Sequence, residues 1–201
     1  MITADRFLAA KHISESEWLR ARRFGVTATA VAEVAAKQDR AKAIDAWMHP
    51  EPVEVNGYMQ FGTDSEAAMM QYAHQSHGIL PVDWVIAGAN PLHRATPDGL
   101  SLDHALIGEC KAPGDPWDGA ETNQKKIPIR YRRQVQFQLH VTGAERCLFL
   151  WNQRVVDGGW FRLAWFEPRS VWIERDEAMI SDLAHVADLM LEVRDEYREA
   201  A

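Results

Sequence analysis

Two carboxylates and one lysine lie close together near the middle of the chain. Asp98 follows a proline, and Glu109 and Lys111 come after a short intervening turn. On an extended strand alternate side chains share a face, so Glu109 and Lys111 point the same way while Cys110 points into the opposite layer. If Asp98 ends a neighbouring strand, two carboxylates and an ammonium group converge on one place.

Such a group suits a hard divalent cation. Carboxylates are the oxygen ligands that Mg²⁺ and Mn²⁺ prefer, and no cysteine or histidine cluster has the spacing of a zinc site. A lysine beside the cation can orient or deprotonate the attacking water, or stabilise charge that develops on a phosphate. The sequence therefore predicts an all-oxygen Mg²⁺ or Mn²⁺ site at Asp98 and Glu109, assisted by Lys111.

The composition fits a single domain over residues 1–201. With 201 residues, of which 47% are hydrophobic, the chain can build one sizeable core. No apolar run approaches the ~18 residues that a membrane span requires, and the first residues lack the apolar core of a secretory signal. The two cysteines, Cys110 and Cys147, have no metal-like spacing, which is typical of a reduced protein. We therefore expect a cytoplasmic protein with no membrane partner.

Basic residues are concentrated in two places, although the net charge is −7. An acidic total argues mildly against a protein that coats nucleic acid, because phosphate neutralisation needs lysine and arginine. The two groups are Arg20, Arg22 and Arg23, and Lys125, Lys126, Arg130, Arg132 and Arg133. A basic surface beside an acidic metal site is compatible with a DNA channel, and equally with an ordinary solvated face.

Helical and strand patterns alternate along the chain. Ser14 is typical of a helix start, as are Thr27 or Thr29 for the next helix. Helices are predicted from Ser14 to Gly25 and over 27–36, 41–48, 61–77 and 170–198, and strands over 79–87, 93–96, 105–112 and, as a pair, 147–151 and 160–166. The apolar stripe of the last helix is expected to pack on the core, with a subunit interface as the alternative. This order suits an α/β fold with a mixed central sheet.

Residues 128–142 carry two conflicting patterns. From Gln134 to Val141, a glutamine or histidine alternates with an apolar residue, which by periodicity indicates a strand. In a helix, Tyr131, Gln134 and Gln138 would instead share one face. The glutamines then either reach a site or lie on a solvated face.

Five short blocks of the sequence resemble the PD-(D/E)XK nuclease superfamily, in the order found in its lambda-exonuclease or YqaJ-type viral recombinase branch. The blocks are Arg-Phe-Gly-Val-Thr-Ala-Thr (23–29), Phe-Gly-Thr-Asp-Ser-Glu (61–66), Ala-Thr-Pro-Asp-Gly-Leu (95–100), Gly-Glu-Cys-Lys (108–111) and the segment from Tyr-Arg-Arg-Gln to Val-Thr-Gly (131–143). The short motif around Asp98 is weak on its own, because its spacing occurs often by chance. The flanking blocks give the resemblance its specificity, and the C-terminal quarter of the chain carries none.

The resemblance implies a restriction-endonuclease-like core, in which α-helices flank a mixed central β-sheet. It favours a helix over 128–142. The residues then expected to take part in catalysis are Asp98, Glu109, Lys111, Glu66, Gln134 and Tyr131. The expected metal ligands are the side chains of Asp98, Glu109 and Glu66 and the backbone carbonyl of Cys110. In this arrangement Lys111 positions the attacking water with the help of Gln134.

Glu66 also has an explanation that needs no catalysis. Thr63 and Glu66 have the spacing of a capping box, in which each side chain satisfies a free backbone donor at the start of a helix. The resemblance instead places the matching acidic residue at the metal site. The two roles do not exclude each other.

A pocket for a terminal 5′-phosphate of DNA is a further implication of the resemblance. Related exonucleases use an arginine and a hydroxyl here, and either Arg22 or Arg23 aligns with that arginine; we prefer Arg23. The free N–H groups of the helix that follows favour an anion, and Thr96 shares the strand face of Asp98. The DNA-binding residues expected are Arg23, Thr29, Thr96, Lys125 and Lys126.

The function implied is that of a phage-type recombination exonuclease, which digests linear duplex DNA from 5′-phosphorylated ends with Mg²⁺ or Mn²⁺. Its expected partners are double-stranded DNA with free ends, a single-strand annealing protein, and further copies of the chain in a ring-like trimer. Such a phage or prophage protein would act in the cytoplasm of a bacterial host. The alternatives are an endonuclease or repair nuclease of the same superfamily, and a non-catalytic DNA-binding module that retains the fold.

Overall fold

A five-stranded sheet forms the centre of the computed structural model, which describes residues 1–52 and 54–200. Its strands are β3 (Ile79–Pro81), β6 (Gly99–Ser101), β7 (Leu106–Lys111), β8 (Arg146–Trp151) and β11 (Arg169–Glu174), in the order β11-β8-β7-β6-β3. β7 and β8 run parallel, whereas the other neighbouring pairs run antiparallel. The sheet is therefore mixed, and β7 is its middle strand.

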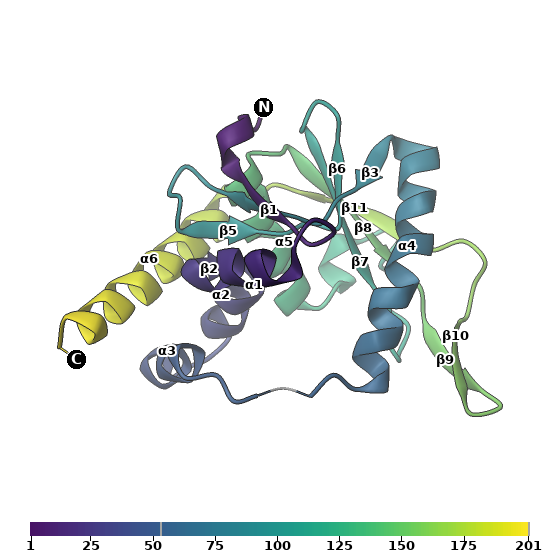
Figure 1. The fold of residues 1–201 in the computed structure, drawn as a ribbon. Helices are drawn as coiled ribbons and strands as arrows, with labels where there is room; N and C mark the ends of the chain where they lie inside the picture. The colour runs from purple at the N-terminus through teal and green to yellow at the C-terminus, as the bar shows by residue number, and fades with distance from the viewer. Residues whose placement is uncertain (53, 201) are drawn as a thin grey trace.

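A second, four-stranded sheet lies next to the first (Figure 1). It consists of β1 (Phe7–Ala10), β4 (Trp84–Ala87), β5 (His93–Ala95) and β2 (Val26–Thr27), in the order β1-β4-β5-β2. The chain leaves the five-stranded sheet after β3 and returns to it before β6. The two crossings lie side by side, because the backbone N–H of Val82 donates to the carbonyl of Asp98 at 3.0 Å.

Helices cover both faces of the five-stranded sheet (Figure 1). α4 (Gly57–His77) packs on one face through Met69, Met70 and Ala73. α5 (Ile129–Thr142) packs on the other face, with α2 (Ala28–Ala35) and α6 (Glu177–Ala200) outside it. The remaining helices are α1 (Glu15–Phe24), α3 (Arg40–Met48) and two 3-10 turns, Ala4–Arg6 and Gln124–Lys126.

A pair of glycines lets α4 approach the central sheet closely. Gly99 in β6 is directly opposite Gly108 in β7. A Cβ atom at Gly99 would collide with the Met70 side chain and would lie 2.7 Å from Ile79 Cγ2. Gly99 is thus a buried strand residue whose missing side chain makes room for α4.

The predicted helix starts are partly confirmed. Ser14 Oγ accepts a hydrogen bond from Glu17 N at 3.3 Å, and Thr27 Oγ1 accepts one from Ala30 N at 3.4 Å. These side chains satisfy backbone donors that have no partner within the helix. Thr27, and not Thr29, is therefore the cap of α2.

The predicted capping box at the start of α4 is wrong. α4 begins well before Phe61, at the cap Asn56, whose Oδ1 accepts from Met59 N at 3.0 Å. Thr63 lies inside the helix and its hydroxyl donates to the Met59 carbonyl at 3.3 Å. Glu66 consequently has no free helix end to cap.

Two predicted strand assignments also need correction. The single strand expected over 79–87 is divided into β3 and β4, which belong to different sheets, because the chain turns between Pro81 and Trp84. The expected pairing of 147–151 with 160–166 does not occur. β8 pairs with β7 and β11, and the turn at Gly158 and Gly159 instead joins β9 (Arg154–Asp157) to β10 (Trp160–Leu163).

The C-terminal helix begins later than predicted, at Glu177, because residues 169–174 form the edge strand β11. Its apolar stripe is buried at Ile180, Leu183, Ala187 and Met190 and packs on the core, as expected. Within the part of the chain that the structure describes, no helix is long and apolar enough to span a membrane.

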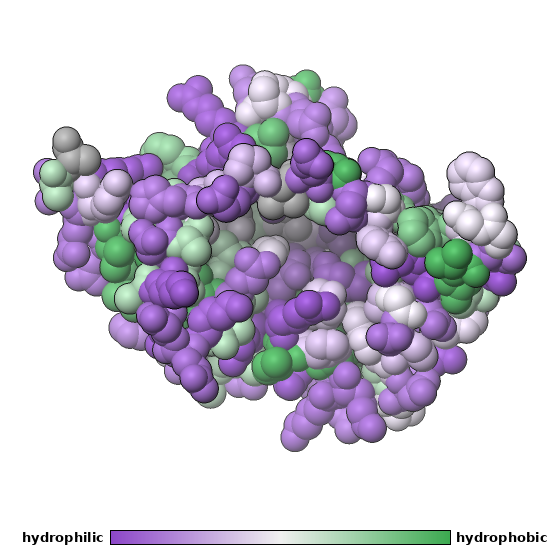
Figure 2. Space-filling view, turned by 90° about the horizontal axis from the view of Figure 1, so that it is seen from below, coloured by the Kyte–Doolittle hydropathy of each residue, from purple (hydrophilic) through white to green (hydrophobic). Residues whose placement is uncertain are grey.

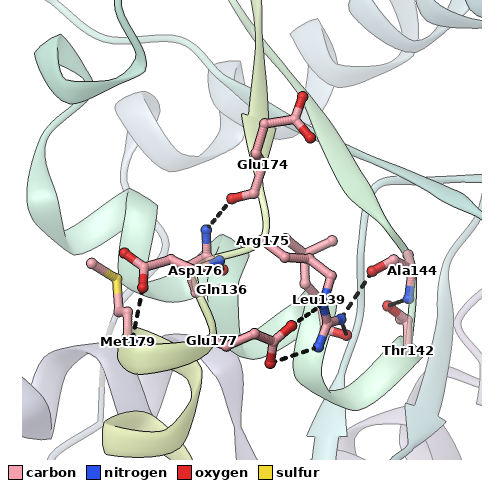
Figure 3. A network of polar contacts seen from close by, with 9 residues as sticks. All are labelled: Gln136, Leu139, Thr142, Ala144, Glu174, Arg175, Asp176, Glu177 and Met179. Atoms are coloured by element: carbon pink, nitrogen blue, oxygen red, sulfur yellow. Dashed lines mark hydrogen bonds and ion pairs between the residues drawn. The ribbon is translucent and has the colours of Figure 1, made fainter.

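The helix over 128–142 is confirmed, and its second polar face explains the misleading alternation. Gln136 is buried, donates through Nε2 to the Glu174 carbonyl at 2.7 Å and accepts at Oε1 from Asp176 N at 2.9 Å. Arg175 donates to the carbonyls of Leu139 and Ala144 at 2.9 and 3.0 Å (Figure 3). These bonds join α5 to the connection between β11 and α6.

Candidate active site

β7 carries Glu109 and Lys111 to the face of the central sheet that α5 covers. Their neighbours across the parallel pair are Phe149 and Trp151 of β8, and Cys110 between them faces the α4 layer. Glu109 is only 1% exposed, while the Lys111 side chain is 23% exposed. Because a buried carboxylate is costly to desolvate, Glu109 needs strong hydrogen-bond partners.

Three donors hold the Glu109 carboxylate. Gln134 Nε2 donates to Oε1 at 2.7 Å, and Gln138 Nε2 donates to Oε2 at 2.8 Å. Lys111 Nζ also donates to Oε1. The Oε1 atom of Gln138 has no hydrogen-bond partner among the described residues. Two glutamines one helical turn apart on α5 therefore fix the orientation of the carboxylate.

Asp98 lies immediately before β6, where the chain returns from the second sheet, and so does not end a strand as expected. Its N–H donates to the Gly108 carbonyl and its carbonyl accepts from Val82 N, both at 3.0 Å. Its Oδ2 accepts from the backbone N–H of Cys110 at 2.7 Å. Backbone bonds thus hold this carboxylate beside the one on Glu109.

Negative charge exceeds positive charge around these residues. Burial raises the pKa of Asp98 well above its ordinary value, and the nearby carboxylates of Glu109 and Glu66 raise it further. Burial and the Glu109 charge also raise the pKa of Glu66, which reaches the site from α4. Burial alone would lower the pKa of Lys111, but Glu109 and Asp98 raise it above its ordinary value. Carboxylates that repel one another in this way favour a bound cation.

The donor set fits a hard divalent cation. Each carboxylate oxygen carries two lone pairs, so Glu109 can contact a cation and keep its glutamine bonds. Within residues 1–52 and 54–200, no three side chains of the His, Cys, Asp or Glu type converge closely enough to hold a metal by themselves. A cation at Asp98 and Glu109 would thus take its other ligands from backbone carbonyls and water, as Mg²⁺ commonly does.

Tyr131 lies beside Lys111 at the start of α5. Lys111 Nζ is 5.4 Å from the centre of its ring, and the guanidinium of Arg130 is 4.5 Å from the same centre. Arg130 also donates to the Tyr131 hydroxyl at 2.7 Å, and the Trp117 ring lies 5.4 Å away. The negative face of an aromatic ring attracts cations, so Tyr131 helps to keep Lys111 in place.

A cleft of about 570 Å³ leads to Asp98 from between α1 and α4. The residues that line it include Trp18, Arg22, Glu66, Trp84, Thr96 and Asp98. Seen from below, the surface is hollowed near its middle, between the α6 side and the hairpin side, and hydrophilic side chains border the hollow (Figure 2).

Arg22 faces the carboxylates, whereas the preferred Arg23 is exposed. The Arg22 guanidinium lies 4.5 Å above the ring of Trp18, one turn earlier in α1. Burial lowers the pKa of Arg22, and the charges of Glu109 and Asp98 oppose that shift. Arg22 is therefore a second cation close to the candidate metal site.

Arg23 and Thr29 line a different cavity, of about 640 Å³, which α1, α2, α3 and the end of α6 enclose. Thr96 lines the cleft that leads to Asp98, and Arg22 borders both spaces. The structure thus does not bring Arg23, Thr29 and Thr96 together into one pocket. Consecutive residues of a helix point about 100° apart, so Arg22 also reaches the cleft that leads to Asp98 and Arg23 does not.

Lys125 and Lys126 lie outside the cleft. Both are exposed in the 3-10 turn that precedes α5. Lys125 lines a separate cavity with Gln136 and Arg175, at the junction of β11 and α6. The structure does not bring either lysine to the candidate metal site.

Two residues of this site were named from the sequence but not assigned to it: Gln138 was only placed on the helical face of Tyr131 and Gln134, and Arg22 was only the alternative to Arg23. Gln138 lies four positions after Gln134 on the same helical face, and that spacing was the available signal. Arg22 lies four positions after Trp18, which places a cation over an aromatic ring on one face of α1. Both signals require the helical register to be known.

The two sheets and their helices form the restriction-endonuclease-like fold, with Asp98, Glu109 and Lys111 at the middle strand. Similar solved structures include an alkaline exonuclease from Laribacter hongkongensis, with a TM-score of 0.69 and 26% identity over 92% of this chain and 96% of that one. The same enzyme in complex with dAMP gives a TM-score of 0.68 and 28% identity over 92% and 97%. A phage-related exonuclease from Haemophilus somnus 129PT gives 0.65 and 13% identity over 88% and 96%, which shows the fold alone.

The model of the YqaJ-like viral recombinase domain matches residues 17–145. The chain therefore belongs to the YqaJ-like viral recombinase family, which confirms the resemblance found in the sequence. No curated protein matches the sequence.

Proposed function

We propose that this protein is a metal-dependent DNA exonuclease that hydrolyses linear duplex from 5′-phosphorylated ends. One observation carries the proposal: Asp98, Glu109 and Lys111 meet at the middle strand, where Gln134 and Gln138 fix the buried Glu109 carboxylate. The alkaline exonuclease to which the chain is similar supports the same reaction class.

The residues that would hold Mg²⁺ or Mn²⁺ are Asp98 and Glu109, with the Cys110 carbonyl as a further ligand and Glu66 reached through water. The cation supplies Lewis-acid stabilisation of the phosphate charge and activation of water. Gln134 and Gln138 keep the Glu109 oxygens in a fixed direction, as outer partners of metal ligands commonly do.

Hydrolysis forms a bond from the water oxygen to the phosphorus and breaks one bridging P–O bond; the water gives up a proton to solvent, and the leaving oxygen takes up a proton from solvent. Lys111 orients the water and offsets negative charge that develops on the phosphate oxygens. Tyr131 and the Glu109 carboxylate hold the Lys111 ammonium from two sides. Correct placement of these groups lowers the barrier because the reacting atoms need no further ordering.

Arg22 is the better candidate for binding the terminal 5′-phosphate. It borders the cleft that Thr96 and Asp98 also line, so a phosphate held by Arg22 and Thr96 would lie next to the metal site. A guanidinium forms strong charge-assisted hydrogen bonds with a phosphate dianion. Arg23 and Thr29 would contribute only from the neighbouring cavity.

Digestion of end-labelled linear duplex and of circular plasmid tests the reaction class. We expect release of label from the linear substrate with Mg²⁺ or Mn²⁺, no release in excess EDTA, weak activity with Zn²⁺ and an intact circle. A cut circle would identify an endonuclease instead. DNA that is bound but never cut, with any of these metals, would identify a non-catalytic binding module.

The preference for 5′-phosphate is tested with two matched arginine variants. Linear duplex with a 5′-phosphate should be degraded faster than duplex with a 5′-hydroxyl. Arg22→Ala should abolish that preference, and Arg23→Ala, one residue away in the same helix, should keep it. Equal initial rates on both ends for the unmodified protein would refute the pocket.

The ring-like trimer and the single-strand annealing partner belong to the same proposal and rest on the family resemblance. Light scattering of the purified protein with and without duplex DNA measures the first. A monomer under both conditions would contradict it. Copurification with an annealing protein from the same source tests the second.

A further inference from the structure

A second space opens beside Lys111, separate from the cleft that leads to Asp98. Its volume is about 370 Å³, and its lining includes Lys111, Asp115, Trp117, Arg130, Tyr131 and Arg154. None of the residues that line this space also lines the Asp98 cleft. The candidate metal site thus lies between two openings, with Asp98 facing one and Lys111 facing the other.

Arg154 is held in this space by the segment that follows β7. Its Nη1 donates to the carbonyl of Ala112 at 3.0 Å, and its backbone N–H donates to the carbonyl of Pro113 at 2.8 Å. Its guanidinium lies 4.6 Å from the ring centre of Tyr58 and 5.8 Å from that of Phe161. Uncharged carbonyls and aromatic rings thus hold the Arg154 side chain in the space beside Lys111, and they do not neutralise its positive charge.

Arg154 is the first residue of the hairpin that β9 and β10 form. In Figure 1 the hairpin projects from the body near the N-terminal end of α4. Phe161 of the hairpin contacts Tyr58 and Phe61 of α4, with ring centres 5.1 and 5.7 Å apart. Arg154 is opposite Leu163 in the hairpin register, whereas Arg162 is opposite Val155 and lies on the other face. The hairpin therefore turns one arginine inward and one outward.

The charges of Arg154 and Arg130 are not neutralised by carboxylates. Arg162, Arg169 and Arg175 each pair with a carboxylate, at 3.0, 2.7 and 2.6 Å. Among residues 1–52 and 54–200, no carboxylate oxygen lies within 4.0 Å of a guanidinium nitrogen of Arg154 or Arg130. Arginines that are positioned by neutral groups beside a lysine form a site for an anion.

We propose that Arg154, with Arg130, binds a backbone phosphate of the DNA strand on the far side of the scissile bond from Arg22. This inference rests on the proposed nuclease function and assigns a second phosphate subsite to it. A strand that crosses the site carries phosphates on both sides of the bond that is cut. Arg22 holds the strand in the Asp98 cleft, and Arg154 holds it in the space beside Lys111.

DNA binding tests this subsite without requiring cleavage. Duplex affinity is measured by fluorescence anisotropy in Ca²⁺ over a range of salt concentrations, for the unmodified protein, Arg154→Ala and Arg162→Ala. Arg154→Ala should weaken binding about tenfold at low salt and reduce the magnitude of the salt slope by about one, the effect of one lost phosphate contact. Arg162→Ala, on the other face of the same hairpin, should match the unmodified protein. Equal affinities and slopes for all three proteins would overturn the subsite.

Replacing single DNA phosphates by an uncharged linkage then shows which phosphate Arg154 contacts. Duplexes that carry a single methylphosphonate near the 5′ end should bind the unmodified protein more weakly at one position, and Arg154→Ala should be insensitive to that position alone. Sensitivity of Arg154→Ala at every position where the unmodified protein is sensitive would overturn the assignment. The nuclease proposal fails by a different result, which is binding of duplex without cleavage by the unmodified protein in Mg²⁺ and Mn²⁺.

Discussion

Gln136 and Gln138 are two residues apart in α5, and their surroundings differ completely. Gln136 uses both ends of its amide, one to the Glu174 carbonyl and one to Asp176 N (Figure 3). Gln138 uses only its nitrogen, which donates to Glu109, and its buried oxygen has no partner among the described residues. In Gln136 both ends of the side-chain amide have a partner, whereas in Gln138 only the nitrogen has one.

The difference separates a structural junction from the proposed reaction site. At the junction of β11 and α6, the nitrogen and the oxygen of the Gln136 side chain each bond to the backbone, which stabilises the fold. Around Glu109, donors are aimed at one carboxylate, and the pKa values of Asp98 and Glu66 are raised because of burial and neighbouring negative charge. Buried carboxylates that repel one another lower the stability of the free protein and favour the binding of a cation.

The largest effect is expected at the reaction site itself. Asp98→Ala, Glu109→Ala and Lys111→Ala should each lower cleavage by about three orders of magnitude or more, because these groups act as a unit. The double variant Asp98→Ala/Lys111→Ala should be little worse than either single variant. Initial rates on linear duplex measure this, with circular dichroism as the control for folding. Near-normal turnover by Lys111→Ala would place the site on another strand.

Gln138→Leu should have the next largest effect, through the position of Glu109. The change keeps the volume of the side chain and removes the hydrogen bond to Oε2, so the cleavage rate should fall about 10- to 100-fold, as for other outer partners of metal ligands. The free energy of unfolding should also fall, because the buried Glu109 Oε2 loses its donor, but removal of the unpaired Gln138 Oε1 offsets part of that loss. A cleavage rate equal to that of the unmodified protein would show that Gln134 and Lys111 suffice to orient Glu109.

Gln136→Leu is the matched variant with the opposite outcome. It leaves the Glu174 carbonyl and Asp176 N without their partner, which should lower the free energy of unfolding by about 1–3 kcal/mol. Cleavage per folded molecule should stay near the unmodified value. Urea unfolding and initial rates are measured on the same preparation. If this variant loses activity while Gln138→Leu retains it, the roles assigned to the two faces of α5 are reversed.

A smaller effect, a dependence of the free energy of unfolding on pH, is expected where α5 contacts β5. His93 of β5 is buried, and its ring nitrogens lie 3.1 Å from His140 Nε2 and 2.9 Å from Asp188 Oδ1. Burial lowers the pKa of both histidines; for His93 the Asp188 charge opposes the shift, and for His140 the His93 and Arg175 charges add to it. Between the lowered values and the ordinary 6.5, the unfolded chain binds more protons than the folded chain.

The free energy of unfolding should therefore fall as the pH decreases below 6.5, the ordinary histidine value. Urea unfolding at several pH values between 7.5 and 5 measures the change. His93→Gln should flatten the dependence, because it removes one of the two groups. A pH dependence identical to that of the unmodified protein would show that other residues cause it.

The fold class and family could be predicted from the sequence because the motif blocks occur in the right order. Local periodicity was less informative. In α5, residues from Val135 to Leu139 are all buried, between the sheet on one side and α2 and α6 on the other. The alternation of glutamine with apolar residues therefore did not report a half-exposed strand. Only the tertiary environment decides that case.

The detail of the candidate site was harder to predict because it depends on register and on chain crossings. Arg22 and Arg23 are neighbours in sequence, yet only the helical rotation determines that Arg22 faces Asp98. The start of α4 depends on its cap, Asn56, which lies before the block of residues 61–66 that resembles the family. The change of sheet between β3 and β4 has no periodic signal, since both segments are apolar and extended.

The facing glycines of β6 and β7 have a consequence for how this enzyme class can be tuned. Met70 occupies the space above Gly99, and Glu66 lies one turn earlier on the same face of α4. Gly99 and Gly108, which have no side chain, thereby let the part of α4 that carries Glu66 approach the sheet closely. A single methyl group at Gly99 would push the helix outward and withdraw Glu66 from the proposed metal site. Variation in activity among related chains can therefore originate at positions that contribute no functional group at all.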